Sequence, residues 1–213
     1  MAVEIQRIDL DHPHKRLLLH AVTIIRAGGL IVYPTDTIYG LGADLFNKEA
    51  MARIFKIKRT SRSKLLSFIC PDLAAVAEWA FVPTSAYRVM RRVTPGPYTF
   101  ILRASKEAPK ILLQKRPTVG VRIPDSAVAI GLVRELGHPL LSTSVPQGED
   151  DFYTDPAAIA ETYKHDVDLI LDAGIQANLP STIVDFSGAA PVIVRQGAGA
   201  VEPLGFQEAY GKF

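Results

Sequence analysis

Two hydrophobic patterns alternate along the chain and predict its secondary structure. Apolar residues spaced three and four apart indicate helices, whereas short uninterrupted apolar runs indicate buried strands. Helices are expected at 17–25, 47–57, from 72, from 83, 126–136 and from 156. Strands are expected at 30–33, 65–70, 98–102, 119–123, 140–144, 169–171, 182–186 and 192–195. Asp125 and Asp155 are expected to cap the helices that follow them, because a carboxylate accepts hydrogen bonds from the first free amides.

This alternation predicts an α/β fold in which helices cover at least one face of a sheet. The strands at 98–102 and 119–123 follow each other without a helical connection, as do the last two, so the sheet should be mixed. No linker, repeat or low-complexity stretch divides the chain, and 213 residues with 48% apolar content suffice for a full core. Residues 1–213 are therefore predicted to form a single domain.

The composition argues against several classes of protein. The single cysteine, Cys70, rules out an intrachain disulfide and a cysteine-based zinc site, and core packing explains it best. The five histidines lack the spacing of metal ligands, so no protein-bound metal is expected. No apolar run is long enough to cross a bilayer, and no secretion signal opens the sequence. The expectation is a reduced, cytoplasmic protein without a membrane partner.

Positive charge is concentrated in the middle third of the sequence. The chain as a whole carries +2, yet residues 53–116 hold 14 basic and 3 acidic side chains, and residues 117–213 carry a net −8. The densest basic run contains no acid and consists of Arg53, Lys56, Lys58, Arg59, Arg62 and Lys64. Such clustering is typical of proteins that bind a nucleotide or another polyanion. The alternative is a solvated helix face that pairs with the acidic C-terminal third.

Hydroxyl side chains gather at the ends of three predicted strands. They are Thr35 and Thr37 after the strand at 30–33, Ser142, Thr143 and Ser144 at the end of the strand at 140–144, and Ser181 and Thr182 at the start of the strand at 182–186. Ligands of open α/β sheets bind at strand ends, so the three groups could line one pocket. Alternatively, each hydroxyl satisfies a backbone group in its own turn.

Two arginines interrupt otherwise apolar strands. Arg122 lies within the strand at 119–123, and Arg195 ends the strand at 192–195. A guanidinium among apolar residues needs a carboxylate or phosphate partner. Asp36 or Asp185 could serve as an internal partner, and a substrate carboxylate or phosphate is the functional alternative.

The familiar nucleotide-binding motifs are missing. The sequence contains neither a G-x-G-x-x-G fingerprint after a strand nor a G-x-x-x-x-G-K-[ST] loop, so other groups would have to hold any phosphate. Gly40 and Gly42 indicate a bulge or a close approach to the backbone, and a tight turn is the alternative.

Several segments resemble blocks of the YrdC/YciO family. The segment Tyr33-Pro34-Thr35-Asp36-Thr37-Ile38-Tyr39-Gly40-Leu41-Gly42 is similar to the family's opening signature. Later blocks follow in the family's order: Pro95-Gly96-Pro97-Tyr98-Thr99, Val121-Arg122-Ile123-Pro124, Ser181-Thr182-Ile183 and Arg195-Gln196-Gly197. The similarity spans about residues 14–204, and it implies a twisted, open, mixed α/β sheet with helices and a positively charged concave surface.

The resemblance also implies an activity. Characterised members make threonylcarbamoyl-AMP and pyrophosphate from L-threonine, bicarbonate and ATP, for the modification of a tRNA adenosine, and Mg²⁺ would accompany the nucleotide. Members are also described as binding double-stranded RNA. A nucleotidyltransferase of this kind is the first hypothesis, and a non-catalytic protein that binds double-stranded RNA, tRNA or a nucleotide is the alternative.

Residue roles carried over from the family fall into three groups. Threonine would be bound by Thr35, Arg122 and Ser181. The nucleotide would be bound by Lys58, Thr118, Ser142, Ser144 and Arg195, of which Lys58 and Ser144 are the expected catalytic residues. RNA would be bound by Arg53, Lys56, Arg59, Arg62 and Lys64.

Two pairs of residues depart from the synthase pattern. Where synthases have Lys-x-Arg, this chain has Lys58-Arg59-Thr60, and where they have Ser-x-Asn, it has Ser144-Val145-Pro146. Proline cannot supply the amide of asparagine, and threonine cannot supply guanidinium charge. The pattern is closer to the YciO branch, and weak or altered activity is therefore an open alternative.

Overall fold

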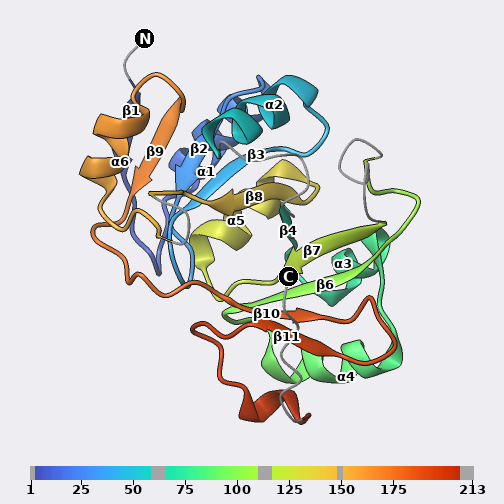
Figure 1. The fold of residues 1–213 in the computed structure, drawn as a ribbon. Helices are drawn as coiled ribbons and strands as arrows, with labels where there is room; N and C mark the ends of the chain where they lie inside the picture. Colours follow the sequence, from blue (N-terminus) through green and yellow to red (C-terminus); the bar gives the residue numbers. More distant parts are fainter. Residues whose placement is uncertain (1–2, 59–65, 110–116, 148–150, 207–213) are drawn as a thin grey trace.

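One mixed β-sheet runs through the part of the chain that the structure describes (Figure 1). This computed structural model describes residues 3–58, 66–109, 117–147 and 151–206. The strands are β1 (Glu4–Arg7), β2 (Ile31–Tyr33), β3 (Gly40–Asp44), β4 (Ser67–Ile69), β5 (Ala80–Phe81), β6 (Tyr98–Ala104), β7 (Thr118–Arg122), β8 (Leu140–Ser144), β9 (Leu169–Asp172), β10 (Thr182–Asp185) and β11 (Val192–Arg195). Their order in the sheet is β1-β9-β2-β3-β8-β4-β7-β6-β10-β11, and β5 pairs with β6 beside this path.

Helices connect many of these strands. They are α1 (Lys15–Arg26), α2 (Lys48–Ile57), α3 (Leu73–Trp79), α4 (Thr84–Val93), α5 (Ala127–Leu136) and α6 (Pro156–Tyr163), with the 3₁₀ helix η2 (Glu202–Leu204) near the end of the described chain. Within the described residues, no helix combines the length and the apolar character needed to span a membrane.

The helix caps follow the expected chemistry with one exception. Asp155 caps α6 as predicted, because its Oδ1 accepts a hydrogen bond from the Ala157 amide at 2.9 Å. The cap of α5 is Ser126, whose Oγ accepts from the Ala129 amide, so the prediction that Asp125 caps this helix is wrong. The Asp125 amide instead donates to the carboxylate of Asp36 at 3.1 Å.

The directions of the strands confirm the mixed sheet. β6 and β7 are antiparallel, as are β10 and β11, whereas β4 pairs in parallel with β7 and β6 in parallel with β10. Sequence reasoning missed β1, β3 and β5. Gly40 and Gly42 lie in β3, whose register with β2 and β8 is regular, so neither a bulge nor a tight turn is present there. The close approach to the backbone is present, because the Tyr33 ring packs against both glycines.

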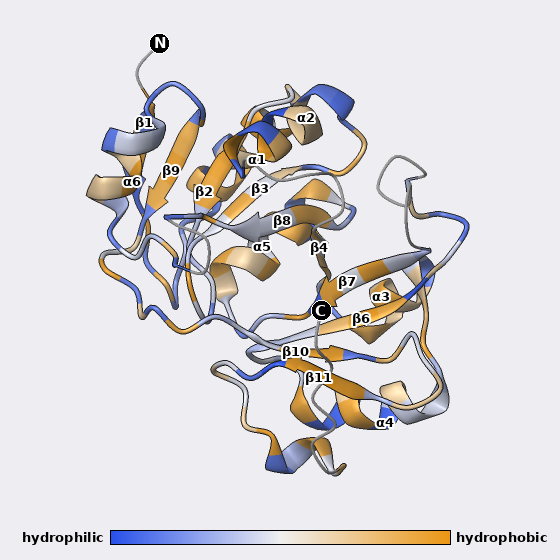
Figure 2. Ribbon diagram, viewed as in Figure 1, coloured by the Kyte–Doolittle hydropathy of each residue, from blue (hydrophilic) through white to orange (hydrophobic). Residues whose placement is uncertain are grey.

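Two separate hydrophobic clusters lie on the two faces of the sheet, and strands such as β2, β4 and β9 contribute alternating residues to both. In β2, Val32 belongs to one cluster and Tyr33 to the other, as the two-residue period of a strand requires. Residues from α1 and α5 cover one face, and residues from α2, α3, α4 and α6 pack on the other. Figure 2 shows β2 and β9 in the orange of apolar residues, whereas β8 is pale because its second half is polar.

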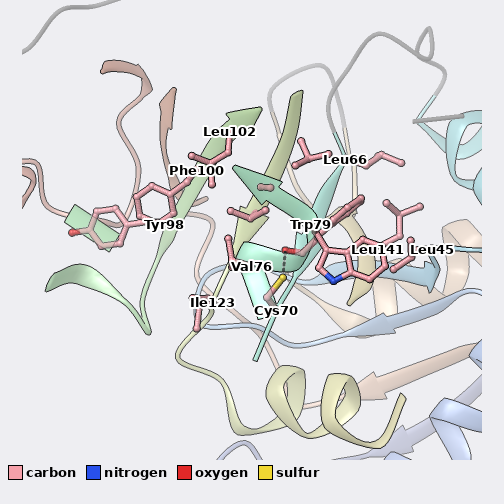
Figure 3. Packing of buried hydrophobic residues seen from close by; sticks show 14 of the residues in the cluster. Leu45, Leu66, Cys70, Val76, Trp79, Tyr98, Phe100, Leu102, Ile123 and Leu141 are labelled. Atoms are coloured by element: carbon pink, nitrogen blue, oxygen red, sulfur yellow. Dashed lines mark hydrogen bonds between the residues drawn. The ribbon is translucent and has the colours of Figure 1, made fainter. Parts of the chain in front are cut away.

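The larger cluster includes the aromatic rings of Trp79 from α3 and of Tyr98 and Phe100 from β6 (Figure 3). Trp79 meets Phe68 edge-on, with 6.0 Å between ring centroids. Cys70 is fully buried beside them, and its thiol lies 3.9 Å from the Phe68 carbonyl. Burial raises the pKa of the Cys70 thiol well above its usual range. The prediction that Cys70 serves core packing is confirmed.

Candidate ligand-binding site

A row of small residues crosses four neighbouring strands on one face of the sheet. Gly42 of β3 pairs with Ser142 of β8, Ser142 pairs with Ser67 of β4, and Ser67 pairs with Gly120 of β7. Paired residues of adjacent strands lie side by side on the same face. Ser67 and Ser142 of this row line a cavity, whereas the space above Gly42 is filled by the side chains of Tyr33 and Leu140.

Tyr33 reaches over part of this row from β2. A Cβ atom on Gly40 would lie 2.8 Å from the Tyr33 ring, and one on Gly42 would lie 2.9 Å from it, so glycine at both positions makes room for the ring. The ring carries its phenol oxygen to 2.6 Å from the Oγ of Ser142. Tyr33 is fully buried, and this burial raises its pKa to about 12, so the phenol keeps its proton at neutral pH.

A cavity of about 790 Å³ lies where β7 ends with Arg122 and β8 ends with Ser142, Thr143 and Ser144. Small-molecule sites in proteins typically measure roughly 300–1,000 Å³, so this cavity can hold a ligand as large as a nucleotide. The lining includes most of the site residues predicted from the sequence: Thr35, Lys56, Lys58, Arg122, Ser142, Ser144, Ser181 and Arg195. The structure thus brings five of the seven strand-end hydroxyls and both arginines to one cavity, and the ligands assigned to them stay predictions. The other two hydroxyls, those of Thr37 and Thr182, are not among the described lining residues.

Arg122 forms a buried ion pair in the wall of this cavity. Its Nη2 donates to Asp36 Oδ1 at 2.7 Å and to Thr37 Oγ1 at 3.2 Å. The side chains of Arg122 and Asp36 are only 11% and 8% exposed. The internal partner that the sequence left open is therefore Asp36. The Nε of Arg122 is buried without a hydrogen-bond partner in the part of the chain that the structure describes.

The hydroxyl of Thr35 has no hydrogen-bonding capacity left for a ligand. Its proton is donated to the Ile38 carbonyl at 2.7 Å. Its oxygen accepts from the Thr37 amide at 3.1 Å and lies 3.1 Å from the Thr37 hydroxyl, which must then be the donor. One donor and two lone pairs are all that a hydroxyl offers. Thr35 therefore shapes the cavity, while its hydroxyl satisfies backbone groups of its own turn. This is the second of the two interpretations that the sequence left open for the strand-end hydroxyls.

Arg195 is fixed against the start of β10. Its Nε and Nη2 donate to the Ser181 carbonyl at 3.1 and 2.8 Å, and the Ser181 hydroxyl lies 2.8 Å from Thr99 Oγ1 of β6. A Cβ atom on Gly197 would lie 2.0 Å from the Pro180 carbonyl, so only glycine permits this approach of the two segments. The positions of Ser181 and Arg195 are therefore set by backbone contacts.

Two lysine side chains also line the cavity. Lys58, the C-terminal cap residue of α2, donates from its Nζ to Thr143 Oγ1 of β8 at 2.7 Å. Lys56 also lines the cavity. Among the described lining residues, Lys56, Lys58, Arg122 and Arg195 are basic, and only Asp166 is acidic. This surplus of positive charge favours an anionic ligand.

Two of the remaining predicted residues, Thr118 and Arg53, lie away from the described lining of the cavity. Thr118 begins β7, opposite Arg103 of β6, and is not among the lining residues in the described chain. Arg53 is bound to Asp168 by an ion pair of 2.9 Å and donates to the Asp166 carbonyl, so it joins α2 to the segment before β9. Arg59, Arg62 and Lys64, three of the residues predicted to bind RNA, lie outside the described residues.

Sequence reasoning missed several lining residues. They include Ser67, Thr99, Gln147, Phe152, Tyr153, Thr162, Tyr163 and Asp166. Ser67 and Thr99 are polar residues within apolar strands, so the criterion that singled out Arg122 could also have found them. The others come from α6 and its flanking segments, where Tyr163 donates to the Pro146 carbonyl at 2.6 Å, and no local sequence signal indicates that contact.

No group of three or more histidine, cysteine or acidic side chains that could hold a metal occurs in the described ranges. The described residues that line the cavity do not form a carboxylate cluster of the kind that binds Mg²⁺.

Fold and site together define a mixed α/β domain with a cationic, hydroxyl-lined cavity on its sheet. The family model Sua5_yciO_yrdC, described as "Telomere recombination", matches residues 23–197. The chain belongs to this Sua5/YciO/YrdC family.

Relatives of two kinds match the chain. YciO of Escherichia coli K12, an uncharacterized protein, is 42% identical over 196 residues, which cover 91% of this chain and 95% of that protein. A threonylcarbamoyl-AMP synthase of Pyrococcus abyssi is 30% identical over 188 residues, which cover 86% of this chain but only 55% of the synthase. The chain thus matches YciO over almost its whole length and the archaeal enzyme over about half of its length.

Solved structures give the same picture. The crystal structure of E. coli YciO matches with a TM-score of 0.91 and 40% identity, over 95% of this chain and 99% of that one. P. abyssi Sua5 complexed with L-threonine matches with a TM-score of 0.85 and 26% identity, over 95% of this chain and 59% of that one. The twisted, open, mixed α/β fold implied by the sequence resemblance is confirmed.

Proposed function

We propose that this protein is a threonylcarbamoyl-AMP synthase-like nucleotidyltransferase, acting on L-threonine, bicarbonate and ATP. The observation that carries the proposal is the convergence of Lys58, Arg122 and Arg195 with serine hydroxyls in one cavity of about 790 Å³. Relationship to threonylcarbamoyl-AMP synthases supports it, as does the likeness to a Sua5 structure complexed with L-threonine.

The residues of the cavity suit two adjacent ligands. Arg122 and Ser181 would bind the carboxylate and polar atoms of threonine, while Thr35 contributes the shape of the wall because its hydroxyl is occupied. Lys58, Ser142, Ser144 and Arg195 would face the phosphates of the nucleotide. Thr118, which is not a lining residue in the described chain, has no role in this arrangement.

The chemistry requires positioning and charge neutralisation. The threonine amine and bicarbonate form a carbamate with loss of water. An oxygen atom of this carbamate attacks the α-phosphorus of ATP, and pyrophosphate leaves as the phosphoanhydride bond breaks. Lys58 is held at the cavity by its bond to Thr143, where its charge would stabilise the oxygens of the transferring phosphoryl group. Mg²⁺ bound with the nucleotide would neutralise further phosphate charge. No covalent enzyme intermediate is needed.

The departures from the synthase pattern bear on the rate. Pro146 lines the cavity where synthases have asparagine, and its ring offers no hydrogen-bond donor to a ligand. Its carbonyl accepts from Tyr163, so this part of the backbone is tied to α6. We therefore expect turnover below that of the synthases. Thr60, the second departure, lies outside the described residues.

The test is threonine-dependent release of pyrophosphate from ATP in the presence of bicarbonate. The expected result is slow release that requires all three substrates and that Arg122→Ala abolishes. Release that is equal with and without threonine would refute the assigned reaction. Pro146→Asn combined with Thr60→Arg should raise the rate if these two positions limit it. Lys164→Ala is the control for a change of charge away from the cavity, because Lys164 belongs to an ion pair on the surface, and it should leave the rate unchanged.

Binding of tRNA or double-stranded RNA is the second candidate. Lys56 and Lys58 place positive charge at the cavity, and the surrounding segment from 53 to 64 contains no acid. Contact with about six phosphates would give a slope of roughly −4 to −5 in a plot of log affinity against log salt concentration. A flat response would eliminate this function. For either function, we propose the cytoplasm, where ATP and tRNA occur, as the site of action.

A further inference from the structure

The hydrogen-bond partners of Tyr33 determine which way the hydroxyl of Ser142 points its proton. The phenol oxygen of Tyr33 is completely buried and lies 2.6 Å from Ser142 Oγ, its hydrogen-bond partner among the described residues. A buried O–H without an acceptor is costly, so the phenol must donate to Ser142. The proton stays on the phenol because the pKa of Tyr33 is raised.

Once Ser142 accepts from Tyr33, its own proton is free for another acceptor. The structure shows no protein acceptor for it in the described part of the chain, and Ser142 lines the cavity. The nearby hydroxyl of Thr35, in contrast, has donated its proton to a backbone carbonyl. Of these two hydroxyls, only that of Ser142 remains a donor toward a ligand.

We infer that Tyr33 is a positioning residue that turns Ser142 into a hydrogen-bond donor for an anionic oxygen of the bound ligand, a phosphate oxygen in the proposed reaction. The inference rests on the proposed function for the identity of the ligand. It assigns a role to three features of β2 and β3 at once: the buried phenol, and the two glycines that make room for its ring. Tyr33 is not among the described residues that line the cavity, so it would act on the ligand only through Ser142.

The direct test is the binding of three probes to the whole protein by calorimetry: AMP, pyrophosphate and uncharged adenosine. Tyr33→Phe keeps the ring and removes only the oxygen. We expect AMP and pyrophosphate to bind about 3- to 10-fold more weakly to this variant, because the Ser142 O–H is no longer directed toward the anionic oxygen in a charge-assisted hydrogen bond. Adenosine, which carries no charge, should bind as before. Tyr98→Phe is the matched control, because it removes a buried phenol that donates to the Ala200 carbonyl, away from the cavity lining.

A second measurement needs no ligand. Ser142→Ala leaves the Tyr33 O–H without its acceptor, and we expect a melting temperature several degrees lower. Adding Tyr33→Phe removes that stranded donor, so the double variant should regain part of the loss. The donor assignment would be overturned if the melting temperature of the double variant fell by as much as the sum of the two single decreases, or by more.

The outcomes separate the inference from the proposed function. If AMP binds and Tyr33→Phe weakens it selectively, but threonine-dependent turnover is absent, the inference stands and the reaction is wrong. If turnover is present and Tyr33→Phe leaves AMP affinity within 2-fold of the wild type, the inference is wrong and the function stands. If the wild type binds neither AMP nor pyrophosphate, both are overturned.

Discussion

The ion pair between Asp36 and Arg122 offers a prediction whose size follows from its burial. Asp36→Ala removes the carboxylate that accepts from Arg122 at 2.7 Å and from the Asp125 amide at 3.1 Å. With 11% of its side chain exposed, Arg122 would keep the Thr37 hydroxyl at 3.2 Å as a partner but lose its counter-charge. Removal of one member of a buried ion pair costs about 3–5 kcal/mol.

For a chain of this size, each kcal/mol lowers the melting temperature by roughly 2–4 °C. Asp36→Ala should therefore melt about 6 °C or more below the wild type, and Asp36→Asn should lose less because its amide oxygen still accepts one hydrogen bond. Glu161→Gln is the control, since it breaks an ion pair with Lys164 on the surface of α6. Such exposed pairs contribute about 0–1 kcal/mol.

Thermal denaturation followed by circular dichroism is the assay, with urea denaturation to obtain free energies. If Asp36→Ala melts within 2 °C of Glu161→Gln, the pair does not stabilise the fold. Arg122 would then be held by its strand alone, and the argument that this arginine needs a fixed internal partner would fail.

Three further predictions concern packing and titration. Gly42→Ala should destabilise the protein by about 1–3 kcal/mol in urea denaturation, because the added Cβ meets the Tyr33 ring, whereas Gly188→Ala, with only a backbone oxygen at 3.8 Å, should be nearly neutral. Cys70 should not react with a thiol reagent at pH 8 until the protein unfolds, since its buried thiol has a raised pKa; rapid labelling of the native protein would contradict the packing. Stability should fall as pH rises from 10 to 12, because Tyr33 and Tyr39 ionise in the unfolded chain near their ordinary pKa of 10.0 but in the fold only near 12; Tyr39→Phe should reduce that slope.

The sequence predicted the regular part of the fold well. Strands such as β2 and β9 are apolar runs whose burial on both faces requires that composition, and α1 and α5 carry clear apolar stripes. It could not predict β3, because the strand is rich in glycine and its stability comes from neighbours on both sides. The residues at positions 40 and 42 must be small because the ring of Tyr33, from β2, packs against them.

The site was predictable to the extent that its residues are unusual for their surroundings. Hydroxyls and guanidinium groups in apolar strands are costly to bury, so Arg122, Ser142 and Ser181 could be identified from the sequence alone. Which of them keep hydrogen-bonding capacity depends on partners far along the chain. The occupied hydroxyl of Thr35 and the donor role of Ser142 follow from contacts that no local pattern contains.

The late position of β10 and β11 in the chain affects how the cavity is completed during synthesis. Ser181 and Arg195 lie near the C-terminal end of the 213 residues, yet β10 pairs with β6, which was synthesised some 80 residues earlier. A nascent chain therefore lacks one wall of the cavity until this hairpin has emerged from the ribosome and docked. Since a ligand that contacts Ser181 or Arg195 binds only the docked state, occupancy would hold the hairpin on the edge of β6 by mass action.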